Sequence, residues 1–285
     1  MGRVMIALIS ESRNTFVTHP ERFGGIHLDE REAPTPFGPI RYLEVEPSDG
    51  PRFLYFAEGG TSATLGVIEA PLAIFHLLQA QAIQRVVMIG KVGGVNPVLT
   101  VGDLLAPDDY FDFTVHRKRS YWQALDPSLS LHYVMERPFC DRLGASNLRA
   151  VHEVKEMFPS LVGNVFERGR YFCTEGPAFE SGAEIAAFRL LGADVVGHSL
   201  LPSVYYAREL GMCMSAICLI SNQAQAYGAA ASQQPFPHSE LADRLLSHLF
   251  LSAAKWGGGA WECACNRDPG LWLRKPVRRG QTAHD

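Results

Sequence analysis

Polar side chains follow several apolar runs of this sequence, at positions where buried strands would end. The stretch IGKVGGVNP (89–97) places Lys91 inside a glycine-rich turn directly after such a run. Comparable positions after other runs hold Glu11, Glu58, Ser62, Glu180, His198, Ser199 and Asn222. An ammonium group, carboxylates, an imidazole and an amide brought together could bind a small polar molecule and transfer protons on it.

The apolar pattern predicts the elements that would position these groups. Continuous apolar runs predict strands at 3–9, 52–60, 85–94, 102–113, 169–177, 193–199 and 212–222. Amphipathic stretches predict helices at 64–82, 147–160, 181–192, 202–211 and 238–256, with Pro71 disturbing the first and Gly192 and Gly211 as C-caps. Alternating strands and helices indicate an α/β fold in three layers, with helices flanking a mixed, mostly parallel sheet. Ligands of such folds bind outside the carboxyl ends of the strands, so the polar residues should converge there.

Composition restricts the class of protein. The 285 residues are 47% hydrophobic and carry a formal net charge of −4, which argues against nucleic acid as a partner. The apolar run at the N-terminus is too short for a membrane span. The interpretation of the cysteines as reduced thiols indicates a cytoplasmic protein without structural disulfides. We expect one domain over 1–256 and an appended tail over 257–285.

Six cysteines bear on redox state and metal binding. Four lie in apolar surroundings and are interpreted as reduced thiols: Cys140, Cys173, Cys213 and Cys218. Cys263 and Cys265 form an isolated C-x-C pair. Zinc sites need four ligands and no second pair has suitable spacing, so no metal is expected.

Three stretches together resemble the trimeric purine nucleoside and methylthioadenosine phosphorylases. They are GGVNPVLTVGDLLAPDDYFDF (93–113), CTEGPAFESGAEIAAFRLLGADVVGHSLLPSVYYARELGM (173–212) and ICLISNQA (217–224). The resemblance covers about residues 4–250. It implies a homotrimer without cofactor that acts on a small-molecule substrate, cleaving the N-glycosidic bond of a purine nucleoside with phosphate. The sugar would pass through an oxocarbenium-like state that charged groups stabilise.

The resemblance is good in the part that would hold the purine. Glu180 corresponds to the family's purine-binding glutamate, Asn222 to the asparagine that contacts a 6-oxopurine, and Phe179 to an apolar wall beside the base. Two structural alternatives remain open: Glu180 would favour a helix dipole as an N-terminal carboxylate, and Asn222 would end a strand as a turn residue.

The resemblance is poor in the part that would hold phosphate. The family's glycine-rich loop after the first strand is replaced by ISESRNTF, which brings Glu11. The family's phosphate-gripping arginine and histidine are replaced in AEGGTSATL, where Glu58 adds a negative charge and Ser62 lies near the histidine position. Ser199 keeps the family's phosphate-side hydroxyl.

Lys91 and Val92 stand where the family has small residues beside the phosphate, followed by Gly93. Three hypotheses account for Lys91. Its ammonium pairs with Glu11 or Glu58 in the vacated anion site, it is catalytic with a lowered pKa, or it points to solvent. His198 replaces a methionine that packs against the sugar, so it could act as an acid, a base or a hydrogen-bond partner, or be a satisfied structural histidine. His116 and Tyr121 could border the site across a trimer interface.

These observations favour an enzyme related to purine nucleoside phosphorylases that does not use orthophosphate efficiently. Its substrate would be nucleoside-like or heterocyclic, with His198, Lys91, Asn222 and Glu11 as catalytic candidates. The alternatives are an active phosphorylase with a rebuilt anion site, in which Lys91, Arg13 and Ser199 bind phosphate, and a non-catalytic ligand-binding homologue.

Overall fold

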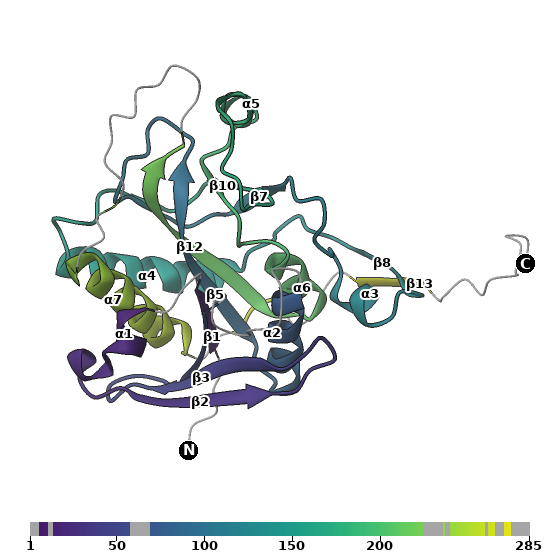
Figure 1. Ribbon diagram of the computed structural model, residues 1–285, viewed down its shortest axis with the longest axis horizontal. Helices are drawn as coiled ribbons and strands as arrows, with labels where there is room; N and C mark the ends of the chain where they lie inside the picture. Colours follow the sequence, from purple (N-terminus) through teal and green to yellow (C-terminus); the bar gives the residue numbers. More distant parts are fainter. Residues whose placement is uncertain are drawn as a thin grey trace, which may run out of the picture.

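The computed structural model describes residues 6–10, 14–57, 69–224, 236, 240–259, 262–265 and 271–274 (Figure 1). Its strands are β1 (Ile6–Ser10), β2 (His27–Ala33), β3 (Ile40–Glu46), β4 (Phe53–Ala57), β5 (Arg85–Gly94), β6 (Leu104–Leu105), β7 (Asp109–Asp112), β8 (Ser130–Tyr133), β9 (Val165–Phe166), β10 (Arg170–Cys173), β11 (Val195–Gly197), β12 (Cys213–Gln223) and β13 (Leu271–Arg274). Its helices are α1 (Thr15–Thr18), the 3-10 helix η1 (Pro20–Phe23), α2 (Glu69–Ala80), α3 (Tyr121–Leu125), α4 (Asp141–Met157), α5 (Gly182–Leu190), α6 (Ser203–Glu209) and α7 (Glu240–Gly257).

A large mixed sheet forms the centre of the described chain. Its strands follow the order β2-β3-β4-β1-β5-β11-β10-β7, while β12 pairs with β5 and with β6. Strands β1, β4, β5 and β12 run parallel, whereas β11 meets β5 antiparallel through Val195 and Val196. This architecture confirms the predicted α/β class with a mixed, mostly parallel sheet.

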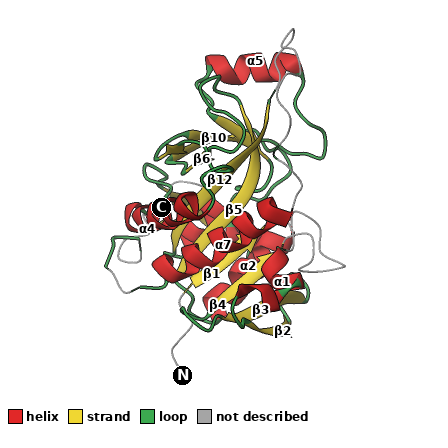
Figure 2. Ribbon diagram, turned by 90° about the vertical axis from the view of Figure 1, so that its left-hand side faces the viewer, coloured by secondary structure: helices red, strands yellow, loops and turns green. Residues whose placement is uncertain are grey.

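Helices cover both faces of this sheet (Figure 2). Side chains of β1 alternate between the faces because successive residues of a strand point in opposite directions. Ala7 and Ile9 join the core beneath α2 and α6, whereas Ile6 and Leu8 join the core beneath α4 and α7. Within the described ranges, no helix is both long enough and apolar enough to cross a bilayer.

The two predicted glycine caps are confirmed. Gly192 and Gly211 adopt left-handed backbone angles, with φ of +84° and +65°, and each follows the C-cap residue of α5 or α6. Beyond Gly192 the amide of Ala193 donates to the carbonyl of Phe188 at 2.9 Å, which satisfies a carbonyl of the last helical turn. These stops end each helix just before β11 and β12, the strands that carry candidate site residues.

Several element predictions need correction. The single strand expected at 102–113 is two short strands, β6 and β7, which have different partners. Helix α4 begins at Asp141, six residues before the predicted start at 147. The prediction missed these residues because the stretch 141–146 is weakly apolar. The antiparallel pair β2–β3 was missed, since its side chains are mostly exposed or half-buried and give no apolar run. In the described part of α2, Pro71 lies in the first turn, where its missing N–H costs little.

Candidate functional site

A cavity of about 870 Å³ opens at the carboxyl ends of β5, β10, β11 and β12. Eight of the residues selected from the sequence line it, so the structure brings together residues up to 131 positions apart in the chain. They are Lys91, Val92, Gly93, Phe179, Glu180, His198, Ser199 and Asn222. The other three, Glu11, Glu58 and Ser62, lie outside the described residues, as does Arg13.

Lys91 lies at the cavity where β5 extends beyond the end of its neighbour β1. Strand β1 pairs with β5 up to Ile89, and β11 pairs with it only from Gly93, so one edge of β5 lacks a β1 or β11 partner at Lys91. The side chain of Lys91 is partly buried on the cavity wall. None of the described carboxylates forms an ion pair with it. Its position disfavours the hypothesis of a lysine that points to solvent.

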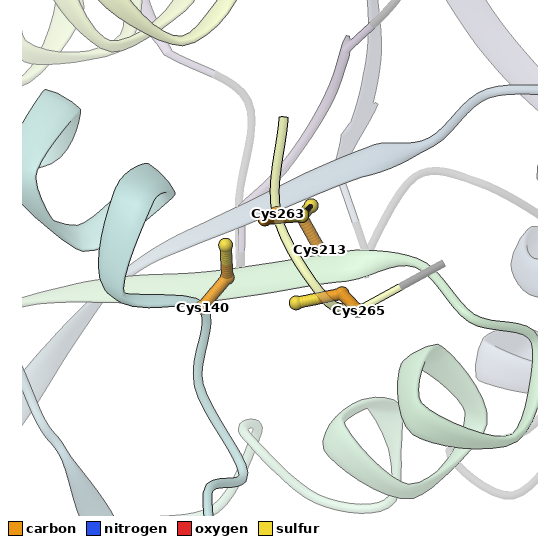
Figure 3. Close-up of side chains that lie close together, drawn as sticks. All are labelled: Cys140, Cys213, Cys263 and Cys265. Atoms are coloured by element: carbon orange, nitrogen blue, oxygen red, sulfur yellow. Dashed lines mark hydrogen bonds between the residues drawn. The ribbon is translucent and has the colours of Figure 1, made fainter. Parts of the chain in front are cut away.

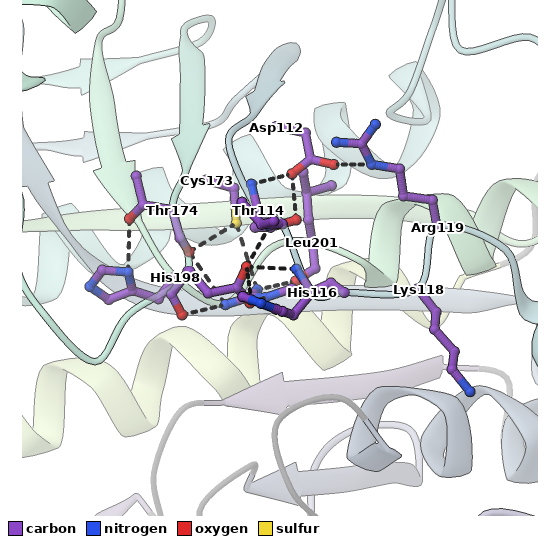
Figure 4. Close-up of polar contacts among 12 residues, drawn as sticks. Asp112, Thr114, His116, Lys118, Arg119, Cys173, Thr174, His198 and Leu201 are labelled. Atoms are coloured by element: carbon purple, nitrogen blue, oxygen red, sulfur yellow. Dashed lines mark hydrogen bonds and ion pairs between the residues drawn. The ribbon is translucent and has the colours of Figure 1, made fainter.

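A chain of hydrogen bonds joins Glu180, Thr174 and His198. The hydroxyl of Thr174 donates to Oε1 of Glu180 at 2.5 Å. The same hydroxyl lies 2.9 Å from Nδ1 of His198 (Figure 4). A threonine hydroxyl has one hydrogen, so its bond to Glu180 requires Nδ1 of His198 to be the protonated donor. A neutral His198 therefore keeps an unprotonated Nε2, which can accept a hydrogen bond or a proton.

Gly176 lies against the imidazole ring of His198. Its φ of +64° lies in the left-handed region, and a Cβ there would come within 3.3 Å of Cγ of His198. A side chain at this position would be strained and would press on the ring. The glycine thus allows the loop after β10 to pass closely beneath His198.

A β-bulge positions the amide of Asn222. The register between β12 and β5 shifts between Ile220, which faces Val92, and Asn222, which faces Gly93, leaving Ser221 as an extra residue. Bulges bend a strand and redirect its side chains. The hydroxyl of Ser221 donates to Oδ1 of Asn222 at 2.9 Å, which orients the amide at the cavity wall. A Cβ at Gly93 would crowd Val196 at 3.2 Å and Ala224 at 3.3 Å, but would make only an ordinary contact of 3.5 Å with Nδ2 of Asn222.

Phe179 lies at the mouth of the cavity and is 85% exposed. Its ring centroid is 6.0 Å from that of His198, with an angle of 43° between the planes. Val92 is only 4% exposed and belongs to the core, so it closes the base of the cavity. The cavity thus has an apolar base and an aromatic edge.

Arg117 and Glu175 also line the cavity. Glu175 lies in the stretch 174–180 that follows an apolar run, whereas Arg117 was missed from the sequence. The side chain of Arg117 is 5% exposed, and its guanidinium donates to the carbonyls of Thr174 and Leu201 and to the carboxylate of Glu175. It stands in the run HRKR (116–119), where no pattern distinguishes it from its basic neighbours. Its role in the fold is to hold the loop after β10 in place.

Glu175 is anchored by charge and by backbone amides. Burial raises its pKa, but hydrogen bonds from the amides of Val115 and His116, together with Arg117, outweigh burial and lower the pKa below the ordinary value. Glu175 is therefore held ionised. His116 lies beside it and is exposed, whereas Tyr121 is fully buried in the core. The expectation that Tyr121 borders an interface between subunits is wrong, because its ring packs against His76 and Tyr206.

The sequence model of the Phosphorylase superfamily matches residues 47–245. The 6-oxopurine nucleoside phosphorylase of Pyrococcus furiosus is 32% identical over 165 residues, which are 56% of this chain and 58% of that protein. The chain thus spans less than two thirds of that relative. The S-methyl-5'-thioadenosine phosphorylase of Pyrococcus horikoshii is 33% identical over 66% of this chain and 70% of its own length.

Solved structures agree on the fold. A methylthioadenosine phosphorylase from an antarctic soil metagenomic library superimposes with a TM-score of 0.79 at 19% identity, covering 99% of this chain and 96% of that one. The methylthioadenosine phosphorylase of Schistosoma mansoni in complex with adenine gives a TM-score of 0.72 at 18% identity, over 93% of this chain and 96% of that one.

Proposed function

The chain belongs to the phosphorylase superfamily, among its purine nucleoside and methylthioadenosine phosphorylases, and we propose that it is an enzyme for a 6-oxopurine nucleoside or a similar heterocycle that uses orthophosphate poorly. The observation that carries the proposal is the cavity in which Glu180, Asn222 and Phe179 meet, with His198 linked to Glu180 through Thr174. Two relatives of this chain are described as 6-oxopurine and S-methyl-5'-thioinosine phosphorylases, names that fit such a ring.

The purine part of the proposal depends on complementary hydrogen bonding. Thr174 occupies one oxygen of Glu180, which leaves Oε2 to accept from an N–H of the base. The amide of Asn222 can donate to one purine acceptor and accept from a neighbouring N–H. Phe179 offers a ring face at the cavity mouth. A carboxylate and an amide at one ring discriminate against analogues that lack the matching groups, because the protein groups would then lose their partners.

His198 supplies the proposed acid–base function. Its Nε2 can accept a hydrogen bond from a sugar hydroxyl or take a proton from an attacking water or hydroxyl. Its Nδ1–H meanwhile donates to Thr174, whose hydroxyl donates to Glu180, so the carboxylate would stabilise the imidazolium that forms. This arrangement would serve hydrolysis or glycosyl transfer, both of which need a general base near the sugar and charge stabilisation as the bond to the base breaks.

Poor use of orthophosphate rests on sequence changes around the expected anion site. The segment ISESRNTF has no glycine, so closely spaced backbone amides of the family's loop are not expected there, and Glu11 and Glu58 would repel an anion. The favoured explanation for Lys91 is a pairing with one of these carboxylates.

A second candidate is an active phosphorylase with a rebuilt anion site. It is favoured by one observation: Lys91 lines the cavity together with Ser199 and has no ion pair among the described carboxylates. An ammonium on a half-buried wall is a suitable anion ligand.

Calorimetric titration with phosphate and with hypoxanthine separates these candidates. The comparison uses wild type, Lys91→Met, which keeps much of the side-chain volume without the charge, and Lys118→Met as a matched control on an exposed lysine that points away from the polar cluster (Figure 4). Hypoxanthine binding without phosphate binding supports the first candidate. Phosphate binding that Lys91→Met abolishes and Lys118→Met preserves supports the second. Failure of hypoxanthine, inosine and methylthioinosine to bind would refute both.

Turnover then distinguishes an enzyme from a binding protein. Release of hypoxanthine from inosine would be followed with and without phosphate. Ligand binding without release on a broad panel of nucleosides would support the non-catalytic homologue.

The proposal includes a homotrimer and a two-part chain. Phe179 is 85% exposed beside the cavity, a position at which a neighbouring subunit would reduce the contact of an aromatic ring with water. The catalytic part would cover 1–256 and the tail 257–285, since α7 ends at Gly257. Light scattering after size-exclusion chromatography would test the trimer.

A further inference from the structure

Four cysteines from three distant parts of the chain meet at one place. Cys140 precedes α4, Cys213 begins β12, and Cys263 and Cys265 come from the segment after α7 (Figure 3). Their Sγ atoms all lie within 4.8 Å of one another, and those of Cys213 and Cys263 are 3.2 Å apart. The sequence argument against a metal required a second closely spaced pair, but the fold supplies Cys140 and Cys213 singly.

The spacing of the sulfurs fits a single tetrahedral ion. Zinc binds thiolates at about 2.3 Å, so the edges of a tetrahedral four-sulfur site measure roughly 3.8 Å. The range from 3.2 to below 4.8 Å spans that value. A disulfide would need about 2.05 Å between two sulfurs, and all four cysteines are free thiols in this structure. Four soft ligands in a compact tetrahedron favour zinc over cations that prefer oxygen ligands.

The surroundings favour thiolates over thiols. Cys140 is the N-cap residue of α4, a helix of 17 residues whose first amides attract negative charge. Arg85 is 6% exposed and interacts electrostatically with Cys213, Cys263 and Cys140. Its guanidinium also donates to the carbonyls of Gly257 and Gly259, which lie just before the C-x-C segment. A cation therefore stands where the complex would carry excess negative charge.

We propose that Cys140, Cys213, Cys263 and Cys265 bind one zinc ion through four thiolates. Four thiols and Zn²⁺ give a tetrathiolate complex of net charge −2 and release four protons, and Arg85 offsets part of that charge. All four positions of zinc are occupied, so the site is structural and not catalytic. Cys213 and Gln223 stand at opposite ends of β12, roughly 33 Å apart for ten strand steps, so the ion would not contact the ligand cavity.

Such a site would attach residues 263–265 to the body of the fold. The zinc would join residues 263–265 to the start of α4 and to the central strand β12 by metal–sulfur bonds. Residues 262–265 would then depend on the metal for their position, independently of whether the cavity binds purines or phosphate.

Metal analysis of the full-length protein tests the proposal. Purification under reducing conditions without added metal, followed by elemental analysis, should give one zinc per chain. Replacement of zinc by Co²⁺ should produce the visible absorption bands of a tetrahedral tetrathiolate complex. Cys263→Ser and Cys265→Ser should each retain roughly a tenth or less of the zinc, since one ligand is lost. Cys218→Ser, on the same strand β12 but outside the cluster, should retain it all.

Two results would overturn the proposal without relying on any variant. Metal-free wild type whose intact mass is lower than that of the fully reduced chain by four hydrogens would show that the four cysteines form two disulfide bonds in place of a zinc site. Metal-free wild type with four alkylatable thiols at these positions, and no binding of added Zn²⁺ or Co²⁺, would show that the cysteines only pack together.

Discussion

Replacing Thr174 by valine tests the hydrogen-bond chain on which the proposed base site depends. Valine has nearly the same shape but no hydroxyl, so it removes the group that lies 2.5 Å from Oε1 of Glu180 and 2.9 Å from Nδ1 of His198. Glu180 then loses the donor that fixes its orientation, and His198 loses the acceptor that fixes its tautomer.

The size of the effect follows from these contacts. A hydrogen bond to a charged group contributes about 1.5–3 kcal/mol when it is well buried. Glu180 and His198 are only partly buried, so solvent can replace much of the lost bond. We expect hypoxanthine binding to weaken by about 1–1.4 kcal/mol, which is roughly five- to tenfold in the dissociation constant.

Calorimetric titration with hypoxanthine measures this change, and Thr114→Val is the matched control. The hydroxyl of Thr114 donates to Asp112 at 2.6 Å, also to a carboxylate, but Thr114 does not line the cavity. The control should leave hypoxanthine affinity unchanged. Wild-type affinity in folded Thr174→Val, or equal losses in both variants, would refute the role assigned to the chain of hydrogen bonds.

Three further predictions concern stability. Burial raises the pKa of Glu209 above its unfolded value, so its contribution to stability is full in acid and is lost as pH rises through the folded pKa. Glu209→Gln should therefore gain stability relative to wild type as pH rises, by at most about 1.4 kcal/mol per pH unit. The same difference in unfolding free energy between the two proteins at pH 5 and at pH 8, measured with urea, would contradict this. Gly197→Ala should cost about 1–3 kcal/mol in urea unfolding, because a Cβ there would lie 2.3 Å from the hydroxyl of buried Tyr171; an unchanged midpoint would show that the ring can move. Ser181→Ala removes the capping box of α5 and should cost that helix about 1 kcal/mol, visible as faster amide exchange over 182–190 but not in α4.

Much of the fold could be predicted because apolar runs record burial directly. Strand β5 was predicted with its observed bounds, since both its faces are covered. Strand β2 could not be, because its side chains face water and resemble those of a loop. Pairing between β8 and β13 joins residues 130–133 to 271–274, a separation that no local pattern reveals.

The candidate site was predictable in position but not in detail. Glu180, His198 and Asn222 all follow apolar runs, and the ends of such runs converge in this class of fold. The contact of Thr174 with both Glu180 and His198 depends on the path of a loop, and a threonine in a sequence carries no sign of it. Arg117 was hidden for the same reason, since its acceptors are mostly backbone carbonyls, which every residue has.

The position of Arg117 has a consequence for how the protein folds. Its guanidinium joins segments that are 57, 58 and 84 residues away along the chain. Closing loops of this length costs entropy before any of these bonds can form, so contacts of such high sequence separation are slow to assemble. The cavity should therefore mature late in folding, after the sheet that carries it. A chain interrupted before Leu201 would lack an acceptor that Arg117 needs, and synthesis must pass that residue before the ligand site can close.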